Sequence, residues 1–249
     1  MIKEERFEHI LTQLKQLGKV GYDELATQLD VSADTIRRDI DLLSNNGLLL
    51  KVRGGAMKKG KSPVHFQDRV SHLTEAKETI ALKVLPLIKN GQTFFMDGGT
   101  TICAVANHLP LNASFRVITN NIALVNALSP FKEIELIVLG GIYDPVTATT
   151  TGTATCEEVK RYFADAYFMG TCAIHPNHGV TAAFMEDAAV KQAMLKCAAK
   201  TVALGDYQKL NTSYNFKVCA LEDLNVLVTD IQGDDPGLDN YRNRNVKLV

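Results

Sequence analysis

Apolar residues recur at helical spacing in three separate stretches of the first 47 residues. The stretch from Glu5 to Leu17 places its apolar side chains on one face, which is the pattern of an amphipathic helix. A shorter stretch from Asp23 to Leu29 repeats the spacing, and a third begins after Ser32, whose side chain can cap a helix. The third stretch ends near Gly47. We therefore predict three helices, the last two joined by a turn of three residues.

The residues after the third predicted helix favour a small hairpin. Residues 48–55 form the pattern of a short strand, a turn and a return strand, and two short helices followed by such a hairpin are typical of a winged helix-turn-helix unit. The next residues are small and basic, which indicates the end of the wing and a connection. We predict a winged helix-turn-helix domain at residues 1–56 and a linker at residues 57–74.

The rest of the chain alternates between short apolar runs and helical stretches, after an amphipathic helix from Thr74 to Ile88. The apolar runs are Thr93–Met96, Phe115–Ile118, Ile134–Leu139, Ala166–Met169, Thr201–Leu204 and Val226–Thr229. Fully apolar strands separated by helices indicate a mainly parallel sheet that is covered on both faces. We predict an α/β domain at residues 75–249, and in such sheets ligands bind at the carboxyl ends of the strands.

Composition and charge narrow the possible functions. The 249 residues carry a net charge of −1, which argues against a protein that coats nucleic acid or anionic membrane along its whole surface. Residues 33–61, however, hold 7 basic and 3 acidic residues, and such a local patch attracts phosphates. No apolar run approaches the ~18 residues that span a bilayer, and the acidic start does not resemble a signal peptide. We expect a cytoplasmic protein with no membrane partner.

Cysteine and histidine residues give no sign of a metal site. The five cysteines are widely spaced and include no CxxC pair, so they indicate neither a disulfide framework nor a zinc site. His175 and His178 form a His-x-x-His pair, but no third ligand lies near them in the sequence. We interpret both histidines as polar surface residues and expect no cofactor.

The outward face of the third predicted helix carries side chains that suit a DNA major groove. Arg37 and Arg38 can each bridge O6 and N7 of guanine or bind a phosphate. Ser32 and Thr35 can donate to phosphate oxygens near the helix N-terminus. The alternative is an ordinary surface helix with a solvated Arg-Arg pair, which the surrounding helix-turn-helix pattern disfavours. Double-stranded DNA is therefore the expected partner.

The predicted wing adds positive charge beside this helix. Lys51 and Arg53 precede the glycine Gly54 at the turn, a place that suits contact with phosphates or with the minor groove. We expect these three residues to contribute to DNA binding.

Residues 55–62 also match the P-loop pattern GxxxxGK[ST], and Phe94 to Asp97 resembles the acidic strand that accompanies it. A working P-loop follows a buried strand and opens a helix, whereas here Pro63 comes directly after the octet. We interpret the match as accidental.

A run of glycine and threonine follows the first strand of the predicted sheet. Asp97 ends the strand, and Gly98, Gly99, Thr100 and Thr101 lead into a helical pattern. Glycines permit close backbone approach, hydroxyl groups donate hydrogen bonds, and a helix N-terminus presents free N–H groups. This arrangement is typical of a site that binds an anion.

Two further turns are expected at the same edge of the sheet. One contains Thr119, Asn120 and Asn121, and the other contains Gly141. Taken alone, each turn could be an ordinary connection between a strand and a helix. Because the carboxyl ends of parallel strands share one edge, we expect the three turns to meet in a single ligand site.

An enzyme is the alternative function. Asp97, Glu186 and Asp206 could supply carboxylates for acid or base chemistry on a sugar phosphate. A lone carboxylate at a turn is, however, usually a helix cap or a hydroxyl acceptor, and no paired acid and base spacing is present. We therefore favour a binding protein that is not an enzyme.

The segment Val31-Ser32-Ala33-Asp34-Thr35-Ile36-Arg37-Arg38-Asp39-Ile40, together with the ending Arg53-Gly54-Gly55-Ala56, resembles the DNA-binding domain of DeoR-type transcriptional regulators. The Asp-x-Gly-Thr-Thr, Thr-Asn and Gly-Gly turns also match that family, in which they mark an effector domain similar to sugar-phosphate isomerases. Two departures are Lys51, where the family commonly has arginine, and Arg53, where it commonly has histidine.

This resemblance implies a repressor that binds a phosphorylated sugar or related metabolite. Because one winged unit covers only a short half-site, we also expect a homo-oligomer, either a dimer or a tetramer. The implied ligand-binding residues are Asp97, Gly98, Gly99, Thr100, Thr101, Thr119, Asn120, Asn121, Gly141 and Lys209. The segment Asp206-Tyr207-Gln208-Lys209 departs from the usual Asp-Ser-Ser-Lys, which could mark a different ligand.

Overall fold

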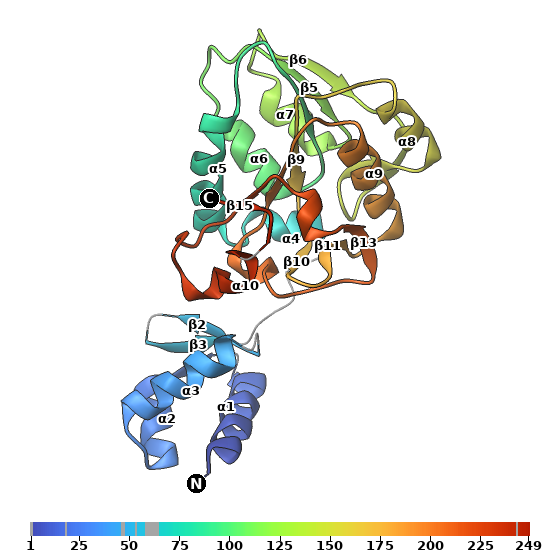
Figure 1. The fold of residues 1–249 in the computed structure, drawn as a ribbon. Coiled ribbons are helices and arrows are strands. Elements are labelled where there is room, and N and C mark those ends of the chain that lie inside the picture. The colour runs from blue at the N-terminus through green and yellow to red at the C-terminus, as the bar shows by residue number, and fades with distance from the viewer. Residues whose placement is uncertain (1, 18, 46–47, 53, 58–64, 243) are drawn as a thin grey trace. The chain divides into compact units, whose positions relative to one another are not determined.

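The computed structural model describes residues 2–17, 19–45, 48–52, 54–57, 65–242 and 244–249. The chain divides into two compact units, Met1–Lys61 and Ser62–Val249, which we call the N-terminal unit and the C-terminal unit. In Figure 1 the first is blue and the second runs from cyan to red.

The described residues of the N-terminal unit form three helices and a three-stranded antiparallel sheet. The elements are α1 (Lys3–Leu17), β1 (Lys19–Gly21), α2 (Tyr22–Leu29), α3 (Ala33–Asn45), β2 (Leu50–Val52) and β3 (Gly55–Met57). The strands pair in the order β1-β3-β2, and buried side chains such as Ile10, Leu25 and Ile40 bring the three helices into one core. The predicted winged helix-turn-helix is confirmed, and β1 is the element that its sequence pattern did not predict.

A largely buried ion pair ties α3 to α1. Arg6 Nε donates to Asp39 Oδ2 at 2.6 Å, and Arg6 Nη2 donates to Oδ1 of the same carboxylate at 3.1 Å. The two side chains are only 13% and 4% exposed. Such a two-point contact fixes orientation as well as distance, so it holds α3 in one position against α1.

A seven-stranded parallel sheet forms the centre of the C-terminal unit. In sheet order its strands are β15 (Lys247–Leu248), β14 (Val226–Val228), β12 (Thr201–Leu204), β9 (Ala166–Gly170), β4 (Thr93–Met96), β5 (Arg116–Thr119) and β6 (Glu135–Val138). All six neighbouring pairs are parallel. The six runs predicted as strands all lie in this sheet with bounds that differ by at most one residue, so the predicted α/β fold class is confirmed.

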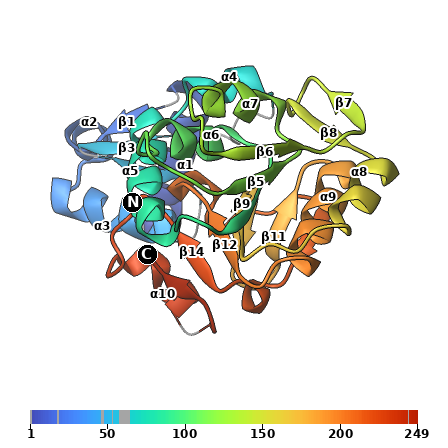
Figure 2. The same cartoon turned by 90° about the horizontal axis from the view of Figure 1, so that it is seen from above.

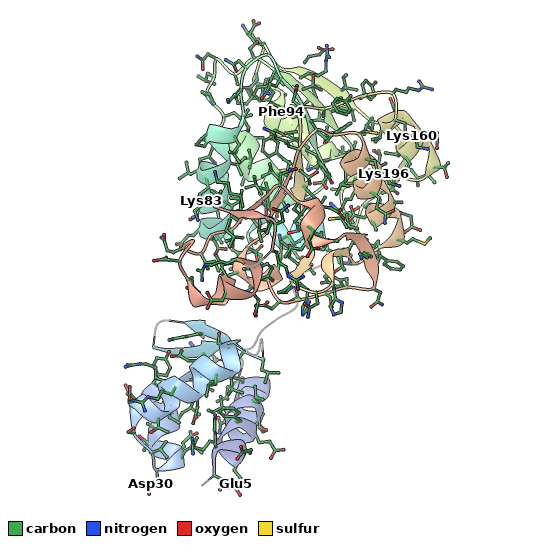
Figure 3. All side chains as sticks on the ribbon, in the orientation of Figure 1. Glu5, Asp30, Lys83, Phe94, Lys160 and Lys196 are labelled. Atoms are coloured by element: carbon green, nitrogen blue, oxygen red, sulfur yellow. The ribbon has the colours of Figure 1, made fainter. Side chains whose placement is uncertain are left out.

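Helices and loops cover both faces of this sheet, as Figure 2 shows. On one face lie α5 (Thr74–Val84), α6 (Thr100–Asn107) and α7 (Ile122–Leu128), packed against Phe94 and its neighbours. On the other face α8 (Thr153–Val159) and α9 (Met185–Lys196) pack against Phe95 and Tyr167. Consecutive residues of one strand thus enter opposite cores, and Phe94, which Figure 3 labels, is fully buried.

The strand order reverses direction at β4. The chain continues from β4 to β5 and β6 toward one edge, and then returns to β9 and proceeds through β12, β14 and β15 toward the other. The carboxyl ends of β4 and β9 therefore lie next to each other while their connections leave in opposite directions. This is the switch point at which open α/β sheets leave a crevice for ligands.

Several smaller elements complete the C-terminal unit. An antiparallel sheet joins β10 (Ala173–His175), β11 (Gly179–Ala182) and β13 (Phe216–Cys219), and β7 (Ile142–Asp144) pairs with β8 (Thr149–Thr151). The remaining elements are the short helices η1 (Leu85–Leu87), η2 (Tyr207–Lys209), η3 (Leu221–Asp223), η4 (Pro236–Leu238) and α10 (Asp239–Arg242). The hydrophobic pattern of the sequence does not predict these elements, because strands and helices of three or four residues leave too short a pattern.

A further helix, α4 (Phe66–Val70), lies within the segment 57–74 that the sequence assigns to a linker. Phe66 is buried, and its backbone N–H donates to the carbonyl of Val146 at 2.7 Å. This helix therefore packs against the C-terminal unit as part of it. No helix in the described parts of the chain is long and apolar enough to cross a membrane.

The ion pair in the N-terminal unit gives a prediction for stability. Asp39→Ala should lower the free energy of unfolding of this unit by about 2–3 kcal/mol, because the variant removes the carboxylate that accepts both hydrogen bonds of the largely buried Arg6. Urea unfolding, monitored by hydrogen exchange of the backbone amides in α1 and α3, measures the loss. Asp41→Ala is the matched control on the same helix, since its pair with Lys51 is exposed and should contribute about 0–1 kcal/mol. Equal losses in the two variants would contradict the prediction.

Candidate functional site

The N-terminus of α3 is closed by two hydroxyl side chains. The backbone N–H of Thr35 donates to Ser32 Oγ at 3.1 Å, and Ser32 Oγ lies 2.8 Å from Thr35 Oγ1. Ser32 is therefore the N-cap of the helix. Both hydroxyl groups lie at the helix end where the sequence places phosphate contacts, and they already bond to each other.

Arg37 and Arg38 lie on the solvent side of α3. Their side chains are 56% and 80% exposed, and each contacts Asp34, at 3.8 Å and 2.8 Å respectively. The Arg37 guanidinium also lies 5.5 Å from the ring centre of Tyr22. Exposed ion pairs contribute little free energy, so a phosphate or a guanine edge can replace Asp34 at low cost.

The wing carries Lys51 on β2, where its ammonium group pairs with Asp41 of α3. Gly54 lies between β2 and β3 with a φ of +88°. Arg53 lies outside the described residues. So do residues 58–62 of the P-loop-like octet, whose first three residues, 55–57, form the strand β3.

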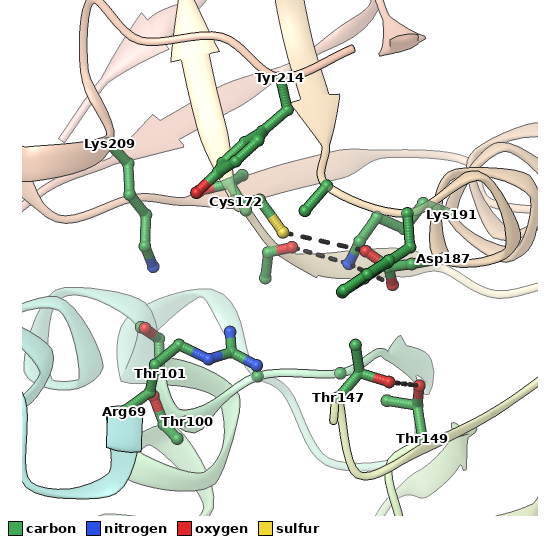
Figure 4. A pocket seen from close by; sticks show the side chains of 16 residues that line it. Arg69, Thr100, Thr101, Thr147, Thr149, Cys172, Asp187, Lys191, Lys209 and Tyr214 are labelled. Atoms are coloured by element: carbon green, nitrogen blue, oxygen red, sulfur yellow. Dashed lines mark hydrogen bonds and ion pairs between the residues drawn. The ribbon is translucent and has the colours of Figure 1, made fainter. Parts of the chain in front are cut away.

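A pocket opens at the switch point between β4 and β9. Figure 4 shows side chains from several elements around the pocket, with Lys209 and Tyr214 opposite Thr100 and Thr147. The lining residues are Arg69, Gly98, Gly99, Thr100, Thr101, Thr147, Thr149, Gly170, Thr171, Cys172, Ala183, Phe184, Asp187, Lys191, Lys209 and Tyr214. Five of the ten residues predicted to bind a ligand are among them: Gly98, Gly99, Thr100, Thr101 and Lys209.

The loop after β4 forms one wall of the pocket. Gly99 has a φ of +134°, a conformation that favours glycine, and α6 begins at the next residue, Thr100. The first N–H groups of a helix lack partners within the helix and lie at the positive end of its dipole. This wall is therefore suited to bind an anion.

Asp97 lies beneath this wall and does not line the pocket. Its carboxylate is 1% exposed and accepts hydrogen bonds from Lys191 Nζ at 2.6 Å, from the Gly170 N–H at 2.7 Å and from the Tyr167 hydroxyl. Burial raises the pKa of Asp97 above its ordinary value, and the charge of Lys191 and the hydrogen bonds from Lys191 and Tyr167 oppose that rise. Asp97 therefore holds the lining residues Lys191 and Gly170 in place.

Lys191 projects from α9 and is held by two carboxylates. Besides Asp97, it lies 3.5 Å from Asp187 Oδ1, and it donates to the Gly170 carbonyl at 2.8 Å. Burial alone would lower the pKa of Lys191, but Asp187 and Asp97 raise it above its ordinary value. Lys191 thus keeps its charge at neutral pH, and the stability it contributes is lost only as the pH rises through that raised pKa.

The Thr119-Asn120-Asn121 turn supports the pocket from outside. The Asn121 side chain caps α7 by accepting from the Ala123 N–H, and it donates to the Asp97 carbonyl. Asn120 donates to the Thr150 carbonyl, and Thr119 Oγ1 accepts from the Asn121 N–H. All three side chains are buried, and none is among the residues that line the described pocket.

Gly141 also lies away from the pocket lining. Its φ is +140°, and an added Cβ would overlap Thr155 Oγ1 and the Thr151 carbonyl. The glycine at this position therefore permits the close approach of β8 and α8.

The lining includes residues that sequence reasoning missed. Thr147 and Thr149, hydrogen bonded to each other at 2.7 Å, come from the β7–β8 hairpin, and Tyr214 comes from the segment before β13. Arg69 comes from α4. The threonine-rich run from 147 to 155 was a signal that could have pointed to the hairpin, whereas Arg69 had none.

The carboxylates considered for catalysis do not converge. Asp97 is buried beneath the pocket, and Asp206 pairs with Lys209 at 3.0 Å and caps η2. Glu186 is exposed on α9 and does not line the described pocket. The rings of His175 and His178 lie 4.5 Å apart, and no group of three or more metal-ligating side chains occurs among the described residues.

Comparison with known proteins gives matches along most of the chain. A family model for a DeoR-like helix-turn-helix domain matches residues 6–59, and one for a DeoR C terminal sensor domain matches residues 72–231. The chain is 34% identical to the HTH-type transcriptional repressor GlcR of Bacillus subtilis, covering 92% of this chain and 89% of that protein. It is 30% identical to the glycerol-3-phosphate regulon repressor of Escherichia coli, covering 92% of each.

Similarity to solved structures is weaker. A ribose 5-phosphate isomerase A from Methanocaldococcus jannaschii has a TM-score of 0.40 and 17% identity, covering 54% of this chain and 53% of that one.

The position of Asp97 predicts a structural role that can be separated from ligand binding. Asp97→Ala should lower the free energy of unfolding of the C-terminal unit by about 3–5 kcal/mol, because it removes the acceptor of three donors and weakens the pairing of a buried lysine. Chemical unfolding in the absence of any ligand measures this loss. Glu186→Ala removes an exposed carboxylate and should change stability by less than about 0.5 kcal/mol. A stable Asp97→Ala variant would show that the carboxylate is not needed for the fold.

Proposed function

Because this chain belongs to the DeoR family, with its helix-turn-helix and sensor domains, we propose that it represses a carbohydrate-metabolism operon in response to a phosphorylated sugar or related metabolite. The winged unit at residues 1–56 binds DNA, and the α/β domain at 75–249 binds the effector, with Arg69 added from the segment between them. The observation that carries the proposal is one pocket that is lined by three cationic side chains and by the N-terminus of a helix.

The chain is a DNA-binding transcriptional regulator and not an enzyme. Its relatives are named as transcriptional repressors, among them one for a glycerol-3-phosphate regulon and one for a lactose phosphotransferase system. Repression requires tight binding to one operator, and the exposed face of α3 suits that task. A regulator of this kind acts where the DNA is, so we infer a cytoplasmic location.

In the proposed complex, α3 lies in the major groove with Arg37 and Arg38 toward the base edges. Both arginines are exposed, while the opposite face of α3 is buried through Ile36, Ile40 and Leu43. Lys51 and Arg53 of the wing contact phosphates beside the groove. One such unit covers a short half-site, so we propose a dimer or tetramer that reads a repeated operator.

The pocket has two ends of different chemistry. Lys209 and the N-terminus of α6 form a cationic end, which suits a phosphate group. Thr147, Thr149 and Asp187 provide hydroxyl groups and a carboxylate, which suit the hydroxyl groups of a sugar or polyol. A phosphorylated polyol satisfies both ends at once, whereas inorganic phosphate satisfies only the first.

The proposed DNA contact predicts a specific loss of affinity. Operator DNA is first selected from a random library with the unaltered chain, and Arg38→Ala should then weaken its binding by about 1–3 kcal/mol, because one guanidinium contact is lost. Titrations at several salt concentrations measure the change. Arg161→Ala is the control, since Arg161 is exposed in the C-terminal unit and lies outside the proposed contact. If Arg37→Ala and Arg38→Ala both bind like the unaltered chain, α3 is not the recognition helix.

The proposed effector site predicts discrimination between a phosphate ester and its parent alcohol. In a panel of glycerol, pentose and hexose phosphates, at least one ester should raise the melting temperature and change operator affinity, while the unphosphorylated compound should not. Lys209→Gln should raise the Kd of that ester by about tenfold, because one charge-assisted hydrogen bond is lost. An ester that binds Lys209→Gln with unchanged affinity would place the phosphate elsewhere.

A further inference from the structure

Arg69 differs from the other two cations of the pocket. Lys191 pairs with Asp97 and Asp187, and Lys209 pairs with Asp206. Arg69 forms no ion pair with an acidic residue in the described parts of the chain. Its Nε is buried and has no hydrogen-bond partner there. In Figure 4 the guanidinium of Arg69 extends toward the centre of the pocket.

An unpaired donor on a partly buried cation costs free energy, so this position favours an anionic ligand. Guanidinium presents a planar fork of N–H donors that matches two oxygens of a phosphate, which an ammonium group cannot do. Among the three cations of the pocket, Arg69 is therefore the one whose free energy a bound phosphate group would lower most.

The helix that carries Arg69 is attached at points next to the pocket. The N–H of Phe66 donates to the carbonyl of Val146, which precedes the lining residue Thr147. After the helix, His72 Nε2 lies 2.8 Å from Gln208 Oε1, next to the lining residue Lys209. A ligand that contacts Arg69 would thus touch α4 directly. If it also contacts Thr147 and Lys209, it touches the residues next to Val146 and Gln208, which hold the two ends of the α4 segment.

Positive charge also accumulates behind α4. The buried Lys77 donates to the carbonyls of Arg69 and His72 and closes the C-terminal end of the helix. Burial, and next the charge of Lys209, lower the pKa of Lys77 to about 8. The charge of Arg69 also lowers this pKa, while Asp206, which pairs with Lys209, opposes the shift. Arg69, Lys77 and Lys209 thus place three positive charges around this short helix, and Asp206 offsets part of their repulsion.

We propose that Arg69 binds the phosphate group of the effector and that α4, through Arg69, is the element by which an occupied pocket acts on the DNA-binding unit. The helix is the first described element of the C-terminal unit after the winged unit. A bound phosphate neutralises the charge around α4 and adds a bond to it, so occupancy makes the helix more rigid. This inference rests on the proposed function, because it requires a phosphorylated effector.

The experiment compares the unaltered chain with Arg69→Met, Arg69→Lys, Lys209→Gln and the exposed control Arg161→Met. The probes are inorganic phosphate and whichever ester of the glycerol, pentose and hexose phosphate panel gives the largest thermal shift with the unaltered chain. Three quantities are measured: the Kd of each probe, hydrogen exchange of residues 65–73, and operator affinity with and without saturating ester. Melting temperatures without ligand show whether each variant is folded.

For the unaltered chain and Arg161→Met, the ester should slow hydrogen exchange of residues 65–73 and change operator affinity by about fivefold or more. Arg69→Met should raise the Kd of the ester by about tenfold. At saturating ester, this variant should also show little of the ester-induced slowing of hydrogen exchange in residues 65–73 and little of the ester-induced change in operator affinity. Arg69→Lys should give an intermediate Kd, because it keeps the charge but loses the fork. Lys209→Gln should bind more weakly but respond fully once saturated.

Three results would overturn the inference in different ways. If the unaltered chain binds esters and responds, but Arg69→Met at saturation responds equally, the effector site stands and α4 is not the coupling element. If no ester or inorganic phosphate binds the unaltered chain or alters its operator affinity, the proposed function fails as well. A response lost equally in Lys209→Gln at saturation would assign the coupling to the whole cationic wall and not to Arg69.

Discussion

Asp97 places a negative charge in the interior of the C-terminal unit, and the pocket is built around the donors that this charge requires. One donor is the N–H of Gly170, another is the hydroxyl of Tyr167, and the third is Lys191 of α9. The carboxylate thus joins the end of β4 to β9 and to a helix on the far face. Removing a charge from water is costly unless it is paired and hydrogen bonded, so these elements are held together by one residue.

This constraint explains why the lining is precise although its residues come from distant parts of the sequence. The loop after β4 and the loop after β9 meet because their strands are neighbours at the switch point. The Asn121 side chain then ties the loop after β5 to the Asp97 carbonyl. Asp97 and Asn121, which look like ligand contacts in the sequence, are therefore residues that hold the pocket lining in place.

The sequence predicts the central sheet well, because each buried parallel strand is a continuous apolar run such as Thr93–Met96. It also predicts the loop from Gly98 to Thr101 as part of the site, since strand, glycines and helix occur in one short segment. It does not predict Arg69 or Thr147, because their places depend on long-range packing. Asp97 illustrates the limit: its residue type and position suggest a ligand contact, and only the positions of Tyr167 and its other donors reveal a support.

The pair between Arg6 and Asp39 has a consequence for how the chain could read DNA. A stripe of aliphatic side chains permits a helix to roll by several degrees about its long axis at little cost. A guanidinium fork on a carboxylate does not permit this, since both hydrogen bonds are lost together when the helix turns. Asp39 directly follows Arg38 in α3, so the same contact sets the angle at which the arginine leaves the protein surface. Discrimination between base pairs by the proposed arginine contact would then depend on Asp39, a residue buried inside the unit.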